Sequence, residues 1–198
     1  NARFIKDHSA LFEKVDVSKQ KAIKYAFVNS RILLIYGAAG TGKTTLINYI
    51  SSLMPKSKKL FLTKTHAAIQ HLQRRINNPG SDSDFICIDS FTRRVNLPDY
   101  DIIFVDECST IDNRTMLNFI SKISSDSLLV LAGDINQIES IDFGNWFYYA
   151  KDIITTQGAN IELLDTWRTQ EENLLSLWEE VRNNDVRITE KLVIDGPF

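Results

Sequence analysis

The sequence has few cysteines and no long apolar run. It contains two cysteines among 198 residues. Cys87 and Cys108 are widely separated and set in apolar surroundings, a pattern that indicates neither a disulfide framework nor a zinc site. No apolar run approaches the roughly 20 residues that a membrane-spanning helix needs, and internal repeats and low-complexity segments are absent. We therefore expect a reducing, cytoplasmic setting without a membrane.

Charge is nearly balanced overall but unevenly distributed. Residues 1–100 hold 16 Lys+Arg and 7 Asp+Glu, a net charge of +9, whereas residues 101–198 hold 7 and 18, a net charge of −11. A basic first half is compatible with a path for a polyanion, and segregated solvated faces explain it equally well. The sequence starts at Asn1 rather than at methionine, so we expect a piece of a longer protein.

The most specific pattern lies between residues 31 and 50. A short apolar run at 32–36 predicts a buried strand, and GAAGTGKT at 37–44 then matches G-x-x-x-x-G-K-[ST] in full. The glycines let the loop curl so that its N–H groups, and the start of a helix predicted over 44–52, point at phosphate oxygens. Lys43 would reach the β- and γ-phosphates, and the Thr44 hydroxyl would sit on Mg²⁺.

A glycine-rich turn without a ligand is the alternative. It is disfavoured because the strand and the helix supply the context that the motif requires. The predicted nucleotide-binding residues of this loop are Gly37, Ala38, Ala39, Gly40, Thr41, Gly42, Lys43, Thr44 and Thr45.

Further apolar runs alternate with helical patterns and predict an α/β fold with a doubly wound, mostly parallel sheet flanked by helices. These runs lie at 60–62, 85–88, 101–105, 128–132 and 160–164. The run at 101–105 delivers Asp106 and Glu107 at its carboxyl end, where open α/β sheets bind ligands. Asp106 is suited to hold Mg²⁺ through water, and Glu107 to orient and deprotonate an attacking water. Beside a phosphate loop, this pair favours a Walker B site over a solvated strand end.

Two other features have both a functional and a structural interpretation, and a third, Gln137, has a functional one. Gln20 precedes Gly37 by 17 residues, and its amide can pair with adenine or simply face solvent on a helix. Gln137 follows the run at 128–132 and is placed to touch a γ-phosphate. Aromatic residues crowd at Phe143 and at 146–149, where core packing and a base-stacking platform are both open.

Taken in order, the motifs resemble the first RecA-like domain of superfamily 1 helicases, especially the RecD-type branch. The resemblance covers about residues 17 to 185. SKQKAI looks like the glutamine-containing adenine motif, GAAGTGKTT like motif I, TKTHAAIQHL like motif Ia, IDSFTRR like motif Ib, VDECSTID like motif II, GDINQI like motif III and LLDTWRTQ like motif IV.

The resemblance implies a RecA-like P-loop domain that hydrolyses Mg·ATP and contacts single-stranded DNA, with RNA also possible. By position, Gln20 would read adenine with Trp167 stacked near it. Lys43, Thr44, Asp106 and Glu107 would carry the hydrolysis, with Gln137 and Arg168 sensing the γ-phosphate. The implied strand-contacting residues are Thr63, Thr65, His66, Ser90 and Phe91.

The resemblance also sets the expected domain boundaries. Residues 1–16 would be a lead-in segment, 17–187 the ATP-binding domain, and 188–198 the start of a linker to a second RecA-like domain that this chain lacks. We expect weak ATPase activity from the chain alone, because the arginine supplied by that second domain is missing.

The sequence departs from the family pattern in the segment that resembles motif Ia. Lys64 stands where the family commonly has proline.

A different class of function also fits the motifs. A nucleotide-gated binding or signalling ATPase would use the same pocket to switch a partner surface without moving nucleic acid. A GTPase is disfavoured because the sequence contains no N-K-x-D base-reading motif.

Overall fold

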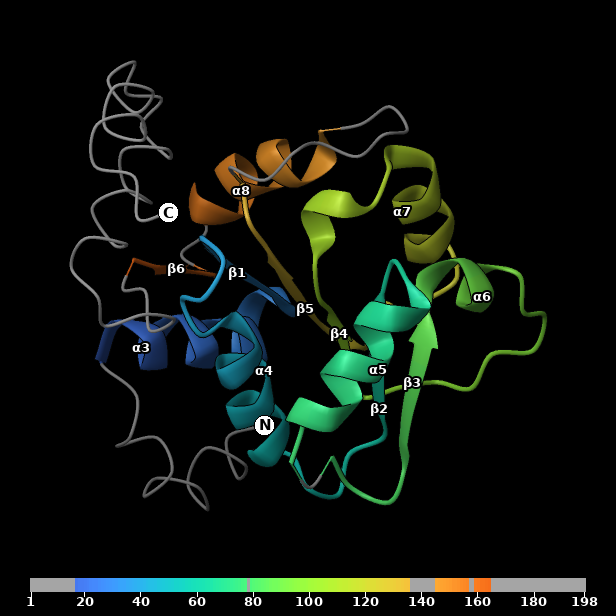
Figure 1. Cartoon of the computed structure of the whole chain (residues 1–198). Coiled ribbons are helices and arrows are strands. Elements are labelled where there is room, and N and C mark those ends of the chain that lie inside the picture. Colours follow the sequence, from blue (N-terminus) through green and yellow to red (C-terminus); the bar gives the residue numbers. More distant parts are fainter. Residues whose placement is uncertain (1–16, 78, 136–144, 157–158, 165–198) are drawn as a thin grey trace, which may run out of the picture.

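A six-stranded sheet forms the centre of the computed structural model, which describes residues 17–77, 79–135, 145–156 and 159–164 (Figure 1). The strand order is β3-β2-β4-β5-β1-β6, and every pairing among the described residues is parallel. The strands are β1 (Ile32–Gly37), β2 (Lys59–Thr63), β3 (Ser83–Cys87), β4 (Ile102–Val105), β5 (Leu128–Gly133) and β6 (Asn160–Leu163).

Helices cover both faces of this sheet. One face is packed by α3 (Val17–Tyr25), the π-helical turn η1 (Ala26–Ser30), α4 (Lys43–Ser52) and α5 (His66–Arg75). The other is packed by α6 (Ile88–Thr92), the 3₁₀ turn η2 (Cys108–Thr110), α7 (Asn113–Ile120) and α8 (Trp146–Thr156).

Burial on both faces explains why the central strands β1, β4 and β5 are continuous apolar runs. In β1, Leu33 and Ile35 join the core under α4, whereas Leu34 and Tyr36 join the core on the opposite face. A strand with alternating side chains has no solvated face when helices lie on both sides, so polar residues are excluded from these central strands. The edge strand β6, by contrast, carries the exposed Glu162. The predicted fold class, a parallel doubly wound α/β sheet flanked by helices, is confirmed.

The strand order decides where the two nucleotide motifs meet. β5 lies between β1 and β4, so the loops that leave β1 and β4 emerge at the same edge of the sheet with only one strand between them. Parallel strands place all their carboxyl ends at this edge. The fold thereby brings together the loop at 37–44 and the pair at 106–107, although 62 positions separate Thr44 from Asp106.

Some boundaries differ from the sequence-based expectation. The strand expected at 85–88 ends at Cys87, and Ile88 begins α6. In the aromatic cluster, Phe147 is buried in the core while Tyr148 and Tyr149 are exposed, so packing accounts for only part of the cluster. Phe143 lies outside the described residues.

Both cysteines are buried and free. Among the helices in the part of the chain that the structure describes, none combines the length and apolar character needed to cross a membrane.

Candidate nucleotide-binding site

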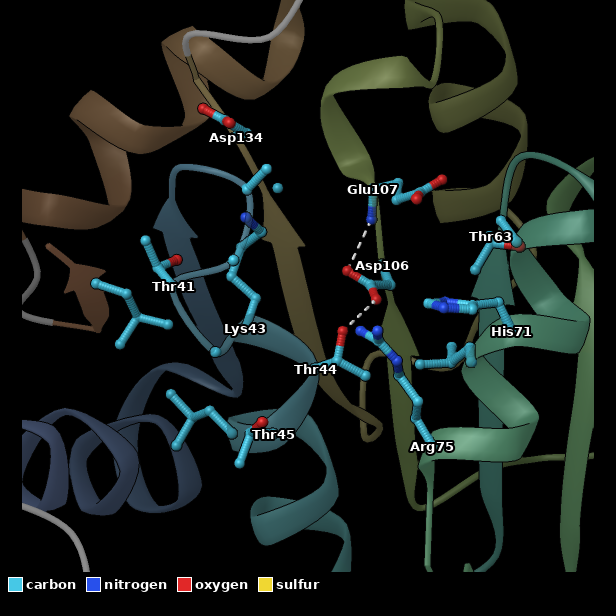
Figure 2. A pocket seen from close by; sticks show the side chains of 18 of the residues that line it. Thr41, Lys43, Thr44, Thr45, Thr63, His71, Arg75, Asp106, Glu107 and Asp134 are labelled. Atoms are coloured by element: carbon cyan, nitrogen blue, oxygen red, sulfur yellow. Dashed lines mark hydrogen bonds between the residues drawn. The ribbon is translucent and has the colours of Figure 1, made fainter. Parts of the chain in front are cut away.

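A pocket of about 770 Å³ opens at the carboxyl edge of the sheet. Its walls are the loop before α4, the ends of β2, β4 and β5, and the inner side of α5 (Figure 2). The predicted residues that line it are Ala39, Gly40, Thr41, Gly42, Lys43, Thr44, Thr45, Asp106 and Glu107, together with Thr63. The two predicted nucleotide motifs therefore form one site.

The phosphate loop is held in shape by contacts within itself. Gly42 is the N-cap of α4 with a φ of +91°, a conformation that favours glycine. The Lys43 ammonium donates to the carbonyl oxygens of Gly37 at 2.7 Å and Ala38 at 2.8 Å. The Thr41 hydroxyl donates to the same Ala38 oxygen at 2.8 Å. A cation thus lies over the loop at the amino end of a helix, where anions are bound favourably.

Two oxygen atoms at the centre of the pocket suit a magnesium ion. The Thr44 hydroxyl lies 3.4 Å from Oδ2 of Asp106, and Asp106 is only 8% exposed. Mg²⁺ prefers oxygen ligands and takes one or two protein groups plus water and substrate phosphates, so this pair fits the ion. Burial raises the pKa of Asp106, whereas the Glu107 N–H, Lys43 and the Thr44 hydroxyl act in the opposite direction. A bound cation would favour the charged carboxylate further.

Glu107 adopts an unusual backbone conformation beside Asp106. Its φ is +57°, and its carbonyl accepts from the Thr110 N–H at 3.0 Å and the Thr110 hydroxyl at 2.8 Å. Its own N–H donates to Oδ1 of Asp106 at 2.9 Å. Burial and the Asp106 charge raise the pKa of Glu107. A raised pKa lies closer to neutral pH and suits a carboxylate that acts as a general base. These bonds hold the residue in the sparsely populated left-handed region, as is common at functional sites.

The pocket also contains residues that sequence reasoning missed. His71 and Arg75 reach from α5 toward Thr44 and Asp106 (Figure 2). Arg75 lowers the pKa of Asp106, and His71 lowers that of Glu107, although burial outweighs both. Their spacing of four residues places both side chains on one face of the helix, and this spacing was the sequence feature that could have indicated a shared site. Others that were missed are Lys19, Leu46, Tyr49, Ala68, Leu72, Gly133, Asp134 and Leu163.

Of the other predicted nucleotide-binding residues, the structure describes one. Gln20 does not line the pocket, although its neighbour Lys19 does. Gln137, Trp167 and Arg168 lie outside the described residues.

The residues expected along a strand path divide into two groups. Thr65, the N-cap of α5, and His66 are exposed, and Ser90 in α6 is half-buried. Phe91 is 1% exposed and packs edge-on against Phe119, so the expectation that it lines the path is corrected. Thr63 is also buried, and it lines the nucleotide pocket rather than an open surface.

An ionic cluster lies where β2 ends. The Lys64 ammonium is 3.1 Å from Oδ2 of Asp112 and 3.5 Å from Oδ2 of Asp89. Asp112 caps α7 by accepting from the Thr115 N–H at 2.7 Å and from the Thr115 hydroxyl at 2.7 Å. Burial alone would raise the pKa of Asp112, but the bonds from Thr115 and Lys64 outweigh it and lower the pKa to about 2.

This low pKa predicts a specific loss of stability in acid. The folded pKa of about 2 lies below the ordinary value of 3.8, so the Asp112 carboxylate stabilises the fold above about pH 4. Its contribution, about 2 kcal/mol, should disappear as the pH falls from about 4 to about 2. Urea unfolding of the wild-type chain and of Asp112→Asn measures this. The difference in unfolding free energy should be constant above pH 5 and shrink below pH 4. A difference independent of pH would contradict the assignment.

Comparison with known proteins gives the family. The profile of the AAA domain family matches residues 15–195. The RecD subunit of the RecBCD enzyme from Buchnera aphidicola is 30% identical over 175 residues, which are 72% of this chain and 29% of that protein.

Two solved structures share the fold. A structure of two coordinating Pif1 helicases at forked double-stranded DNA has a TM-score of 0.58 at 14% identity, over 85% of this chain and 48% of that chain. Bacteroides Pif1 with ADP-AlF3 and single-stranded DNA has a TM-score of 0.54 at 15% identity, over 87% of this chain and 47% of that chain. The chain thus spans about a third of its RecD relative and about half of each Pif1 chain. It belongs to the AAA domain family, and its resemblance to the RecD-type motor domain of superfamily 1 helicases is confirmed.

Proposed function

We propose that the chain is the ATP-hydrolysing motor domain of a superfamily 1, RecD-type DNA helicase or translocase, and that it is part of a longer protein. The observation that carries this proposal is the convergence of Lys43 and Thr44 with Asp106 and Glu107 in one pocket at the carboxyl edge of the sheet. A pocket of about 770 Å³ suits a nucleotide-sized ligand. The Bacteroides Pif1 structure with ADP-AlF3, which has the same fold, supports a nucleotide as that ligand.

Each group in the pocket has a role in this hydrolysis. The loop N–H groups and Lys43 bind the phosphates, because both present positive charge to them. Thr44 and Asp106 would hold Mg²⁺, which supplies charge neutralisation at the β- and γ-phosphates when it is bound. Glu107 accepts a proton from the attacking water, a task suited to a carboxylate with a raised pKa.

The remaining roles in nucleotide recognition stay predictions. Gln20 would read adenine with Trp167 near it, and Gln137 and Arg168 would sense the γ-phosphate. The expected boundaries at 1–16, 17–187 and 188–198 also stay predictions, as does a second RecA-like domain that completes the site. A cytoplasmic location is supported by the two buried, free cysteines.

A single strand would cross the molecule near the start of α5. Thr65 and His66 precede or begin that helix, and Ser90 lies in α6. Hydroxyl and imidazole groups at such positions suit phosphate contacts that fix register without reading sequence. The single-stranded DNA bound to Bacteroides Pif1 supports this ligand class, and RNA is not distinguished from DNA by these residues.

Steady-state ATP hydrolysis by the chain and by the full-length protein, each with and without single-stranded DNA, tests the proposal. We expect weak turnover by the chain, because an arginine supplied across the cleft typically contributes about 10³ to 10⁵ in rate. The full-length protein should be strongly stimulated by the strand. If single-stranded DNA neither binds to the full-length protein nor stimulates it, a nucleotide-gated switch becomes the better account, and the roles of Thr65, His66 and Ser90 are wrong.

A further inference from the structure

Lys64 joins three segments of the chain that carry different tasks. It lies between the end of β2 and the start of α5, directly before Thr65 and His66. Its ammonium bridges Asp112 at 3.1 Å and Asp89 at 3.5 Å, and its side chain is 24% exposed. A lysine held by two carboxylates in a largely covered position has little freedom to move alone.

The Asp112 end of this cluster is continuous with the hydrolytic site. From Glu107 the chain passes through η2, in which Thr110 donates twice to the Glu107 carbonyl and Ile111 N–H donates to the Cys108 carbonyl. Asp112 follows at once and caps α7. A displacement of Glu107 would therefore be passed along a short bonded segment to the carboxylate that Lys64 holds.

The Asp89 end reaches the proposed strand path. Asp89 lies in α6 next to Ser90, and α6 packs against α7. Figure 1 shows α6 and α7 side by side, close to the end of the sheet where α5 begins. Through its two ion pairs, Lys64 thus joins the segment before α5 to α6 and to the N-cap of α7.

We propose that Lys64 is a positioning residue that couples the nucleotide pocket to the strand path, through Asp112 on one side and Asp89 on the other. This inference rests on the proposed function. A nucleotide that shifts the segment 107–112 would alter the Lys64 contacts and, with them, the placement of Thr65 and Ser90. By linkage, the strand would change the affinity for nucleotide by the same factor.

The test compares strand affinity with and without bound nucleotide. The dissociation constant of a fluorescein-labelled oligothymidylate is measured by anisotropy on the full-length protein, without nucleotide and with saturating Mg²⁺ and a non-hydrolysable ATP analogue. We expect the two constants to differ by about 5-fold or more in the wild type, the usual lower range of allosteric coupling. In Lys64→Met this ratio should fall close to one, while the affinity for the analogue without DNA is unchanged. Lys64→Arg, which preserves both ion pairs, should retain the ratio.

Two further variants distinguish a loss of coupling from a mere loss of positive charge and from misfolding. Lys58→Met removes the same charge at the other end of β2, where Lys58 pairs with Asp82 at 4.0 Å, so it should weaken strand binding slightly and leave the ratio intact. Asp89→Asn breaks one ion pair at a half-exposed site without touching the cap of α7, so it should lower the ratio even if Lys64→Met folds poorly.

The outcomes distinguish this inference from the function on which it rests. A ratio that persists in Lys64→Met and Asp89→Asn overturns the coupling role of Lys64, and so does a wild-type protein that binds DNA with a ratio of one. In both cases the strand-binding function stands. A wild-type protein that binds no DNA overturns the proposed function, and the inference fails with it.

Discussion

Replacing Glu107 with glutamine is expected to reduce ATP turnover by about 10² to 10⁴, the usual contribution of a general base. Nucleotide binding should be unchanged, because the phosphate contacts that we propose come from the loop and Lys43 rather than from this carboxylate. The amide keeps the size of the side chain and leaves the Glu107 backbone bonds to Asp106 and Thr110 in place. Steady-state hydrolysis by the full-length protein, together with titration of a fluorescent ATP analogue, measures the two effects separately.

Glu162→Gln is the matched control for this change. Glu162 lies in β6, accepts weakly from the Tyr36 hydroxyl at 3.5 Å and does not line the pocket. The same carboxylate-to-amide change there should leave turnover within about twofold of the wild type, because most surface substitutions have small effects. A Glu107→Gln protein that retained a tenth or more of wild-type turnover would remove Glu107 from the role of base.

The sheet could be predicted because its central strands are buried on both faces. A strand with helices on both faces is apolar along its length, so the central strands β1, β4 and β5 stand out as runs without periodicity. The phosphate loop adds a motif whose glycines, lysine and threonine have fixed tasks, and the Asp-Glu pair follows one of the apolar runs. Chain order and the rule that ligands bind at the carboxyl edge were then enough to place Lys43 and Asp106 in one site.

Side-chain direction within a motif was not predictable. Motif order identified the segment around Ser90 but not the short helix that it forms, in which consecutive residues point about 100° apart. Ser90 is half-buried, and the next residue, Phe91, turns into the core against Phe119. An aromatic residue beside a predicted strand path therefore serves packing.

The contribution of α5 was missed for a related reason. The sequence marks its apolar stripe through Ile69 and Leu72, which are buried against the sheet. His71 and Arg75 flank that stripe, and their environment depends on how α5 packs against α4. Arg75 lies in the last turn of α5, where a cation suits the helix dipole, yet it faces the Asp106 carboxylate across the pocket. Tertiary packing, not local propensity, assigned both residues to the site.

The second large effect is expected from Gly37→Ala. A Cβ added at Gly37 would lie 2.4 Å from the Leu163 carbonyl oxygen and 2.9 Å from the Thr41 hydroxyl. Leu163 is the residue of β6 paired with Gly37, so the clash is with the backbone of a neighbouring strand and cannot be relieved by a side-chain rotation. Such overpacking costs about 1 to 3 kcal/mol, and the melting temperature should fall by several degrees, about 2 to 4 °C for each kcal/mol. Thermal unfolding followed by circular dichroism measures the change.

Gly42→Ala separates this steric effect from backbone conformation. No atom lies within 4 Å of a Cβ built at Gly42, but its φ of +91° is unfavourable for any residue with a side chain. That cost is about 1 to 2 kcal/mol. Gly42→Ala should therefore melt above Gly37→Ala. Because Gly42 lines the pocket and is the N-cap of α4, the variant should still lose nucleotide affinity as the strained loop shifts. Equal melting temperatures for the two variants would mean that β6 yields to the added methyl group. In that case the close approach of Gly37 to Leu163 would not set the cost of the Gly37→Ala change.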